Sequence, residues 1–267
     1  MSPATAQPAP MPATEMPYSE AEYAAMMEQL ITEDDEPVDN ILSAKQQRLL
    51  TETLYSSWDG AGHKFLAEAN IGLFHVMRNP AIVPDMLLSL DVEVRQDWWD
   101  KTQRSYFVWE FGKPPDVVVE VVSNTVGGEQ TEKKRKYALI RVLYYLVFDP
   151  QHHLSNDTLT IYRLDGLSYR RHDGLDLAEV KLGLTLWEGV YEDMAGTWLR
   201  WVDEHGALIP TGNERAEHER AEKEHERAEK ERERAEKERE RAEKEAVLER
   251  AERLAAQLRA LGVNPEA

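Results

Sequence analysis

PPDVVVEVVSNTVGGEQTEKKRKY, residues 114–137, joins a buried strand to a lysine-rich helix. The run from Val117 to Val122 is almost unbroken valine, which is typical of a strand covered on both faces. Side chains two or four residues apart point to the same face of a strand, so Asp116 and Glu120 share one face. An ionised carboxylate is costly to bury unless it is paired or binds a metal. The stretch therefore predicts a buried strand whose acids have a specific partner.

Length, composition and charge narrow the class of protein. The 267 residues suffice for one large domain or two small ones, and the absence of cysteine excludes disulfides and thiolate metal sites. The first 20 residues lack the pattern of a secretory signal, and no apolar run is long enough to span a membrane, so we expect a cytoplasmic protein. The net charge of −18 argues against a general nucleic-acid coat but leaves local basic clusters open.

Composition divides the chain into three segments. Residues 1–40 are rich in Pro and Ala and then acidic, which predicts a disordered N-terminal segment, with a short docking helix as the alternative. We interpret residues 41–210 as the folded domain. From residue 211 to 267 the sequence becomes highly charged and repetitive, which predicts a charged helix or coiled-coil tail.

The middle segment predicts an α/β or α+β fold with a mixed central sheet and flanking helices. Strands are expected around Val119 and over residues 69–77, 81–94, 104–112 and 143–150. Alternation on both sides of Asp165-Gly166 predicts a hairpin over 159–172. A helix is expected over 129–141, where Tyr137 and Ile140 have helical spacing.

The tail repeats every seven residues. Each repeat places Glu four residues before Lys, an arrangement that stabilises a helix by about 0.2–0.5 kcal/mol per pair. Its apolar residues are alanines only, whereas a coiled coil uses two large apolar residues per heptad. Residues 213–246 are therefore expected to form a single solvated helix. A true apolar seam exists only near the end, where we expect homo-oligomer formation through residues 247–261: Val247, Ala251, Leu254, Leu258 and Leu261.

Two acids and a lysine provide what a metal-dependent phosphodiesterase needs. Asp85 opens one apolar strand, Glu120 lies within another, and Lys133 begins a basic cluster on the helix that follows. Mg²⁺ and Mn²⁺ prefer hard oxygen ligands, and such a metal activates water. A neighbouring cation stabilises charge that develops on the phosphate. We therefore predict that Asp85 and Glu120 hold Mg²⁺ or Mn²⁺, with one lysine of the group Lys133, Lys134 and Lys136 as the catalytic cation.

Five stretches together resemble the Uma-type family of bacterial restriction endonucleases, within the PD-(D/E)xK nuclease superfamily: VPDMLLSLDVEV (83–94), RSYFVWEFGKPPDVVVEVVSN (104–124), GGE (127–129), KKRKYA (133–138) and YYLVFDP (144–150). The resemblance implies a restriction-endonuclease-like fold, nucleic acid (most simply DNA) as substrate, and Asp85 and Glu120 as the two acids. Where the superfamily has its lysine, two residues after Glu120, this chain has Val122. The family pattern implies instead Lys133, four residues before Tyr137.

Each of these residues has a simpler alternative. Asp85 could be a turn residue, and Asp116 could cap the turn before its strand. Glu120 could form a buried ion pair with an arginine such as Arg104, and Lys133 could be a solvated partner of Glu129.

Four auxiliary residues complete the candidate site: Asn70, Asp116, Glu129 and Tyr137. Asp116 shares the strand face of Glu120. Asn70 could bond a site acid or only the backbone, while Glu129 and Tyr137 share the helix face of Lys133. The alternative function is a catalytically silent, nuclease-derived interaction module whose helical tail binds a partner.

Overall fold

The computed structural model of the protein describes residues 19, 22, 40–77, 79–93, 104–122 and 129–260. The side chains of residues 129, 130, 258 and 259 lie outside this description. The chain divides into two compact units, Met1–Thr211 and Gly212–Ala267. The predicted disordered segment, residues 1–40, lies outside the described residues except for Ser19, Glu22 and Asn40.

A six-stranded mixed sheet in the order β1-β3-β5-β6-β7-β8 forms the centre of the first unit. Only β5 and β6 are parallel, and the helix α4 (Glu129–Ile140) connects them, as a parallel pair requires. The other neighbours are antiparallel, so the predicted mixed α+β fold is confirmed. The strands are β1 (Phe65–Ala69), β3 (Met86–Leu90), β5 (Val117–Val121), β6 (Tyr144–Phe148), β7 (Leu159–Asp165) and β8 (Ser168–His172).

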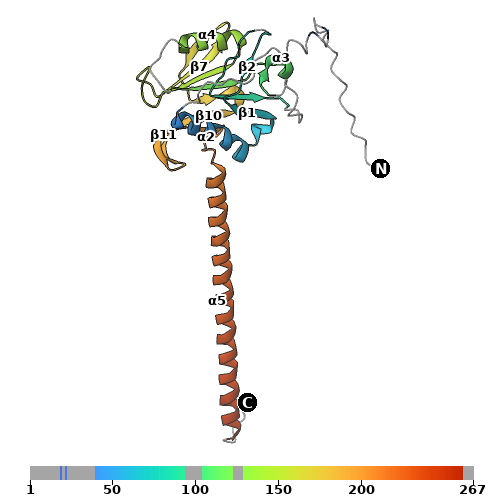
Figure 1. Cartoon of the computed structure of the whole chain (residues 1–267). Coiled ribbons are helices and arrows are strands. Elements are labelled where there is room, and N and C mark those ends of the chain that lie inside the picture. The colour runs from blue at the N-terminus through green and yellow to red at the C-terminus, as the bar shows by residue number, and fades with distance from the viewer. Residues whose placement is uncertain are drawn as a thin grey trace, which may run out of the picture. The chain divides into compact units, whose positions relative to one another are not determined.

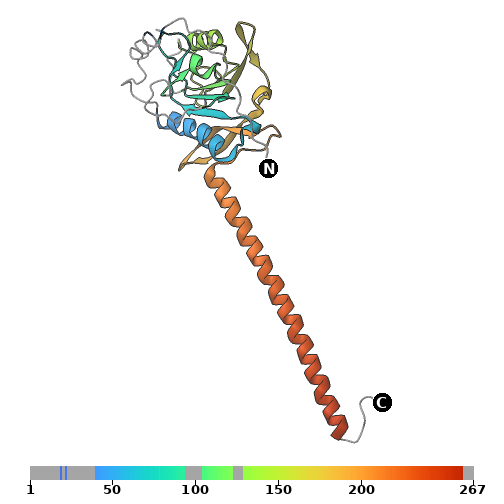
Figure 2. The same cartoon turned by 90° about the vertical axis from the view of Figure 1, so that its right-hand side faces the viewer.

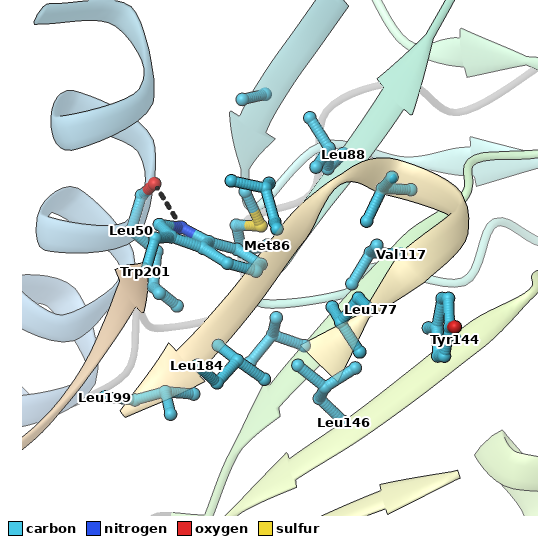
Figure 3. Close-up of a cluster of buried hydrophobic side chains, with 14 of the residues drawn as sticks. Leu50, Met86, Leu88, Val117, Tyr144, Leu146, Leu177, Leu184, Leu199 and Trp201 are labelled. Atoms are coloured by element: carbon cyan, nitrogen blue, oxygen red, sulfur yellow. Dashed lines mark hydrogen bonds between the residues drawn. The ribbon is translucent and has the colours of Figure 1, made fainter. Parts of the chain in front are cut away.

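Different layers cover the two faces of this sheet (Figures 1 and 2). The helix α4 packs on the face of Val118 and Val122, in one buried apolar cluster. The opposite face, with Val117, carries the second cluster, to which the helix α2 and a small antiparallel sheet contribute (Figure 3). These elements are α2 (Ile41–Ser57), β9 (Asp176–Leu177), β10 (Leu182–Tyr191) and β11 (Met194–Asp203), and the short pieces are η1 (Gly60–Gly62), β2 (Leu73–Phe74), β4 (Tyr106–Phe107), α3 (Val108–Phe111) and η3 (Ala178–Val180).

The helix α2 is held in place by polar contacts as well as apolar ones. The side chain of Asn40 caps its N-terminus by accepting from the Ser43 N–H at 2.9 Å. The amide of Gln46 satisfies both backbone groups of Leu199 on β11, with bonds of 2.8 and 3.0 Å. The Trp201 indole donates to the Leu50 carbonyl at 2.9 Å (Figure 3). These contacts fix the position of α2 against the small sheet.

Two predicted strands are largely wrong. Over 69–77, strand β1 ends at Ala69 because Asn70 adopts a φ of 52°, a left-handed conformation that asparagine tolerates. In the rest of this range, only the two residues of β2 form a strand. Over 104–112, strand β4 has two residues and then turns into α3, which ends at Gly112 with a φ of 74°.

The other predictions for the domain agree with the structure more closely. The helix over 129–141, the strand over 143–150 and the hairpin over 159–172 are confirmed by α4, β6 and the β7–β8 pair. The predicted strand over 81–94 is shorter, five residues in β3. The long β10–β11 hairpin was not predicted.

The second unit contains one continuous helix, α5 (Gly212–Ala260), which confirms the predicted helix over 213–246. The Glu226–Lys230 and Glu233–Lys237 pairs are each joined at 2.5 Å. Near the end, Val247, Leu248 and Leu254 are exposed. Within the described part of the chain, no helix combines the length and apolarity needed to cross a membrane.

Candidate active site

The register of three neighbouring strands aligns three polar residues. Ala69 pairs with Met86 across β1 and β3, and Met86 pairs with Val119 across β3 and β5. Extending both registers by one residue places Asn70 opposite Asp85 and Asp85 opposite Glu120. Side chains directly opposite in an antiparallel pair have Cβ atoms about 4.5–5.5 Å apart. The two predicted metal-binding acids therefore lie side by side.

Glu120 lies within β5 and is 6% exposed, yet both of its carboxylate oxygens are bonded. Lys133 Nζ donates to Oε2 at 2.8 Å, and the Tyr137 hydroxyl donates to Oε1 at 2.6 Å. The two donors lie one turn apart on α4 and so share the helix face that covers β5. A buried carboxylate requires such partners, which explains how this acid is accommodated in an apolar strand.

Asp85, directly before β3, is bonded from two other elements. The Val121 N–H donates to Oδ2 at 2.5 Å, and the Gln47 side-chain amide donates to Oδ1 at 3.0 Å. Gln47 belongs to α2, is 3% exposed, and also accepts from the Asn70 amide at 2.8 Å. Asn70 thus contacts Gln47 by its side chain and Asp85 by its backbone, the N–H donating to the Asp85 carbonyl at 3.3 Å.

Gln47 is the site residue that the sequence analysis missed. It lies 38 residues from Asp85, on a helix that was not predicted. The available signal was a pair of glutamines, Gln46 and Gln47, separated only by an arginine from the apolar pair that begins at Leu49. Two adjacent buried amides in one helix each need hydrogen-bond partners, and here Gln46 bonds β11 whereas Gln47 bonds Asp85 and Asn70.

The electrostatics of two tyrosines support a single site for both acids. Burial first, and then the Glu120 carboxylate, raise the pKa of Tyr137 well above its ordinary value. Burial and Glu120 likewise raise the pKa of Tyr145 on β6, and Asp85 adds to the shift for both phenols. Both phenols therefore stay protonated, and Tyr137 acts at Glu120 only as a hydrogen-bond donor.

Asp116 is not assembled with these residues. The Asp116 carboxylate accepts from the Leu90 N–H at 2.7 Å and from Lys113 Nζ at 2.6 Å, at the turn that leads into β5. It shares a face with Glu120 but lies about 13 Å away along the strand, since each residue advances about 3.3 Å. Glu129 begins α4, and its side chain lies outside the described part.

The donor set fits a hard divalent cation. Among the described residues, no group of three or more His, Cys, Asp or Glu side chains surrounds a common point. The candidate ligands are instead the Asp85 and Glu120 carboxylates, beside the amide oxygens of Gln47 and Asn70. Each carboxylate oxygen has two lone pairs, so it can accept a hydrogen bond and also bind a cation. Oxygen donors of this kind suit Mg²⁺ or Mn²⁺, with water filling the remaining positions.

Comparison with known proteins identifies the family. A solved structure described as a "putative nuclease belonging to DUF820", from Anabaena variabilis, aligns with a TM-score of 0.39 and 13% identity, over 53% of this chain and 72% of that one. No curated protein matches the sequence. The family model Uma2, described as "Putative restriction endonuclease", matches residues 27–193, which is more than half of the chain. The chain therefore belongs to the Uma2 family of restriction endonuclease-like proteins.

Proposed function

We propose that the protein is a metal-dependent endonuclease that hydrolyses phosphodiester bonds in DNA. The family supports a nuclease function. The observation that carries the finer proposal is that Asp85 accepts from the N–H of Val121, the residue after Glu120, while Lys133 donates to Glu120 at 2.8 Å. Two carboxylates and a lysine at one point are the groups that phosphodiester hydrolysis requires.

Asp85 and Glu120 would hold the metal, Mg²⁺ or Mn²⁺. When bound, such an ion activates water and neutralises charge on the phosphate. The surrounding residues fix the two acids: Gln47 orients the Asp85 carboxylate, and Tyr137 orients that of Glu120 by donating to Oε1. Second-layer bonds of this kind determine how well a metal site is preorganised.

Lys133 has two roles in this proposal. In the absence of metal, its ammonium group balances the buried Glu120 carboxylate. With substrate present, the same ammonium lies beside the acids, where it can contact a phosphate oxygen and stabilise the charge that develops in the transition state. Its side chain is 31% exposed, so it is accessible from solvent.

Cleavage of DNA by the full chain tests the function. We expect strand breaks in supercoiled plasmid with Mg²⁺ or Mn²⁺ and none with EDTA. Glu120→Gln and Asp85→Asn should lower the rate at least about 100-fold because each removes one metal-binding charge. Glu132→Gln, at an exposed acid paired with Lys136, is the matched control and should cleave like wild type. Metal-independent cleavage, or wild-type rates in both site variants, would refute the proposal.

A catalytically silent interaction module is the alternative, and one observation favours it. The α5 helix exposes Val247, Leu248 and Leu254, which is an apolar surface available to a partner helix. Wild-type protein that binds DNA with metal present but never cleaves it would support this alternative. Homo-oligomer formation through residues 247–261 and a cytoplasmic location stay predictions.

A further inference from the structure

The region around α4 has a net positive charge, whereas the chain as a whole is strongly negative. Residues 129–141 contain five basic and two acidic residues, within a protein whose net charge is −18. This region also supplies Lys133 to the acid pair. A concentration of positive charge beside a candidate phosphodiesterase site is where a polyanionic substrate would be held.

In the described part of the chain, Lys134 contacts an aromatic ring and not a carboxylate. Its Nζ lies 3.3 Å from the centroid of the Tyr162 ring on β7, and its side chain is half-buried. Burial lowers the pKa of its ammonium group. Its neighbours Lys133 and Lys136 pair with carboxylates, but within the described residues Lys134 forms no ion pair. An ammonium that is partly removed from water without a counter-ion is stabilised by an anionic ligand.

Positively charged side chains continue across the sheet from Lys133 towards β8, away from the acids. Lys133 reaches Glu120 on β5, whereas Lys134 lies over Tyr162 on β7, two strands away and so about 10 Å across the sheet. Arg171 on β8 is directly opposite Tyr162 and therefore lies on the same face, one strand further on. Its ion pair with Asp157 is at 2.9 Å, with both side chains about half-exposed. Such surface pairs contribute little and exchange readily with another anion.

We propose that Lys133, Lys134 and Arg171 form a cation row that binds the phosphate backbone of the nucleic acid on one side of the scissile bond. The proposal rests on the proposed function and adds to it the surface that carries the substrate. Contacts of this kind position the nucleic acid without reading its sequence.

Salt-dependent binding to DNA tests the cation row. The full chain is titrated onto a labelled 20-base-pair duplex with Ca²⁺ in place of Mg²⁺, and fluorescence anisotropy gives the affinity from about 50 to 200 mM NaCl. Each phosphate contact contributes about 0.9 to the slope of log affinity against log salt. Lys134→Gln with Arg171→Gln should weaken binding about tenfold or more at low salt and reduce the slope by about two.

Arg135→Gln is the matched control. Arg135 is exposed on α4 and, like Lys134, forms no ion pair among the described residues, but it points about 100° further around the helix than Lys134. The Arg135→Gln variant should therefore keep the wild-type slope of log affinity against log salt. Arg171→Gln alone, expected to reduce the slope by about one, covers the case in which loss of Lys134 impairs folding. An unchanged slope in the Arg171 variant, an equal loss in the Arg135 variant, or no DNA binding by wild type would overturn the proposal.

The two proposals fail separately. If wild type binds DNA and the variants lose slope, but no metal supports cleavage, the cation row stands and the nuclease proposal fails. If wild type cleaves DNA and the cation-row variants keep the full slope, the nuclease stands and the cation row fails.

Discussion

Replacing Gln47 with leucine should weaken both the fold and the metal site, whereas the same change at Gln46 should weaken only the fold. Both glutamines are buried on α2, and each side-chain amide makes two strong hydrogen bonds. They differ in partner: Gln46 bonds the Leu199 backbone, and Gln47 bonds Asp85 and Asn70. This difference makes Gln46→Leu a control of the same size, burial and chemistry.

The magnitude follows from the bonds removed. Gln47→Leu removes one bond to a carboxylate, which contributes about 1.5–3 kcal/mol, and one to an amide, which contributes about 1 kcal/mol. The free energy of unfolding should therefore fall by roughly 2–4 kcal/mol. For a domain of this size that corresponds to a decrease in Tm of about 5–15 °C. Gln46→Leu removes the partners of the Leu199 N–H and carbonyl on β11. The free energy of unfolding should therefore fall by a similar amount in this variant.

Thermal unfolding and Mn²⁺ titration of the two variants form the assay. The Gln47 variant should bind Mn²⁺ about 10- to 100-fold more weakly, as expected for loss of a bond that orients a ligand. The Gln46 variant should retain wild-type affinity despite its lower Tm. If both variants bind Mn²⁺ equally well, Gln47 has no role in orienting Asp85, and the reasoning is refuted.

Three further predictions concern the catalytic lysine, pH and the tail. Lys133→Met should lower cleavage about 100-fold or more because it removes the cation beside the phosphate; Lys136→Met should cleave normally, and the reverse ranking would show that the wrong lysine was chosen. Arg48 and Lys45 lower the pKa of Glu192 to about 2, from an ordinary 4.5. The stability that Glu192 provides is therefore present above pH 4.5 and lost as the pH falls towards 2. An exposed ion pair contributes less than about 1 kcal/mol, so Glu192→Gln should lower Tm only slightly at pH 7. This difference in Tm between variant and wild type should vanish at acidic pH. Deleting residues 247–267 should abolish self-association in ultracentrifugation, and an unchanged oligomeric state would count against the apolar tip.

Local patterns predicted the parts of the fold that short-range rules govern. The valine run of β5, the helical spacing of α4 and the Asp165-Gly166 turn each have a direct signal in sequence. The β10–β11 hairpin has none, because its two turn residues, Glu192 and Asp193, both adopt positive φ without glycine or asparagine. The end of β1 at Asn70 likewise depends on a backbone conformation that the sequence does not specify.

The candidate site was predictable where chain neighbours or the family pattern point to it. Alternation placed Glu120 on an interior face, and helical spacing placed Lys133 and Tyr137 together on α4. Strand alternation alone could not separate Asp116 from the site, since it gives the face and not the position along the strand. The role of Gln47 could not be predicted because its partner, Asp85, lies directly before β3 and meets α2 only through tertiary packing.

Mn²⁺ binding measured by isothermal titration calorimetry is the most direct test that Asp85 and Glu120 form one metal site. The full chain should bind a single ion through the two acids, and this heat should disappear in both Asp85→Ala and Glu120→Ala. Circular dichroism of each variant verifies that the fold is intact. Equal binding heats in wild type and in the two variants would contradict the account.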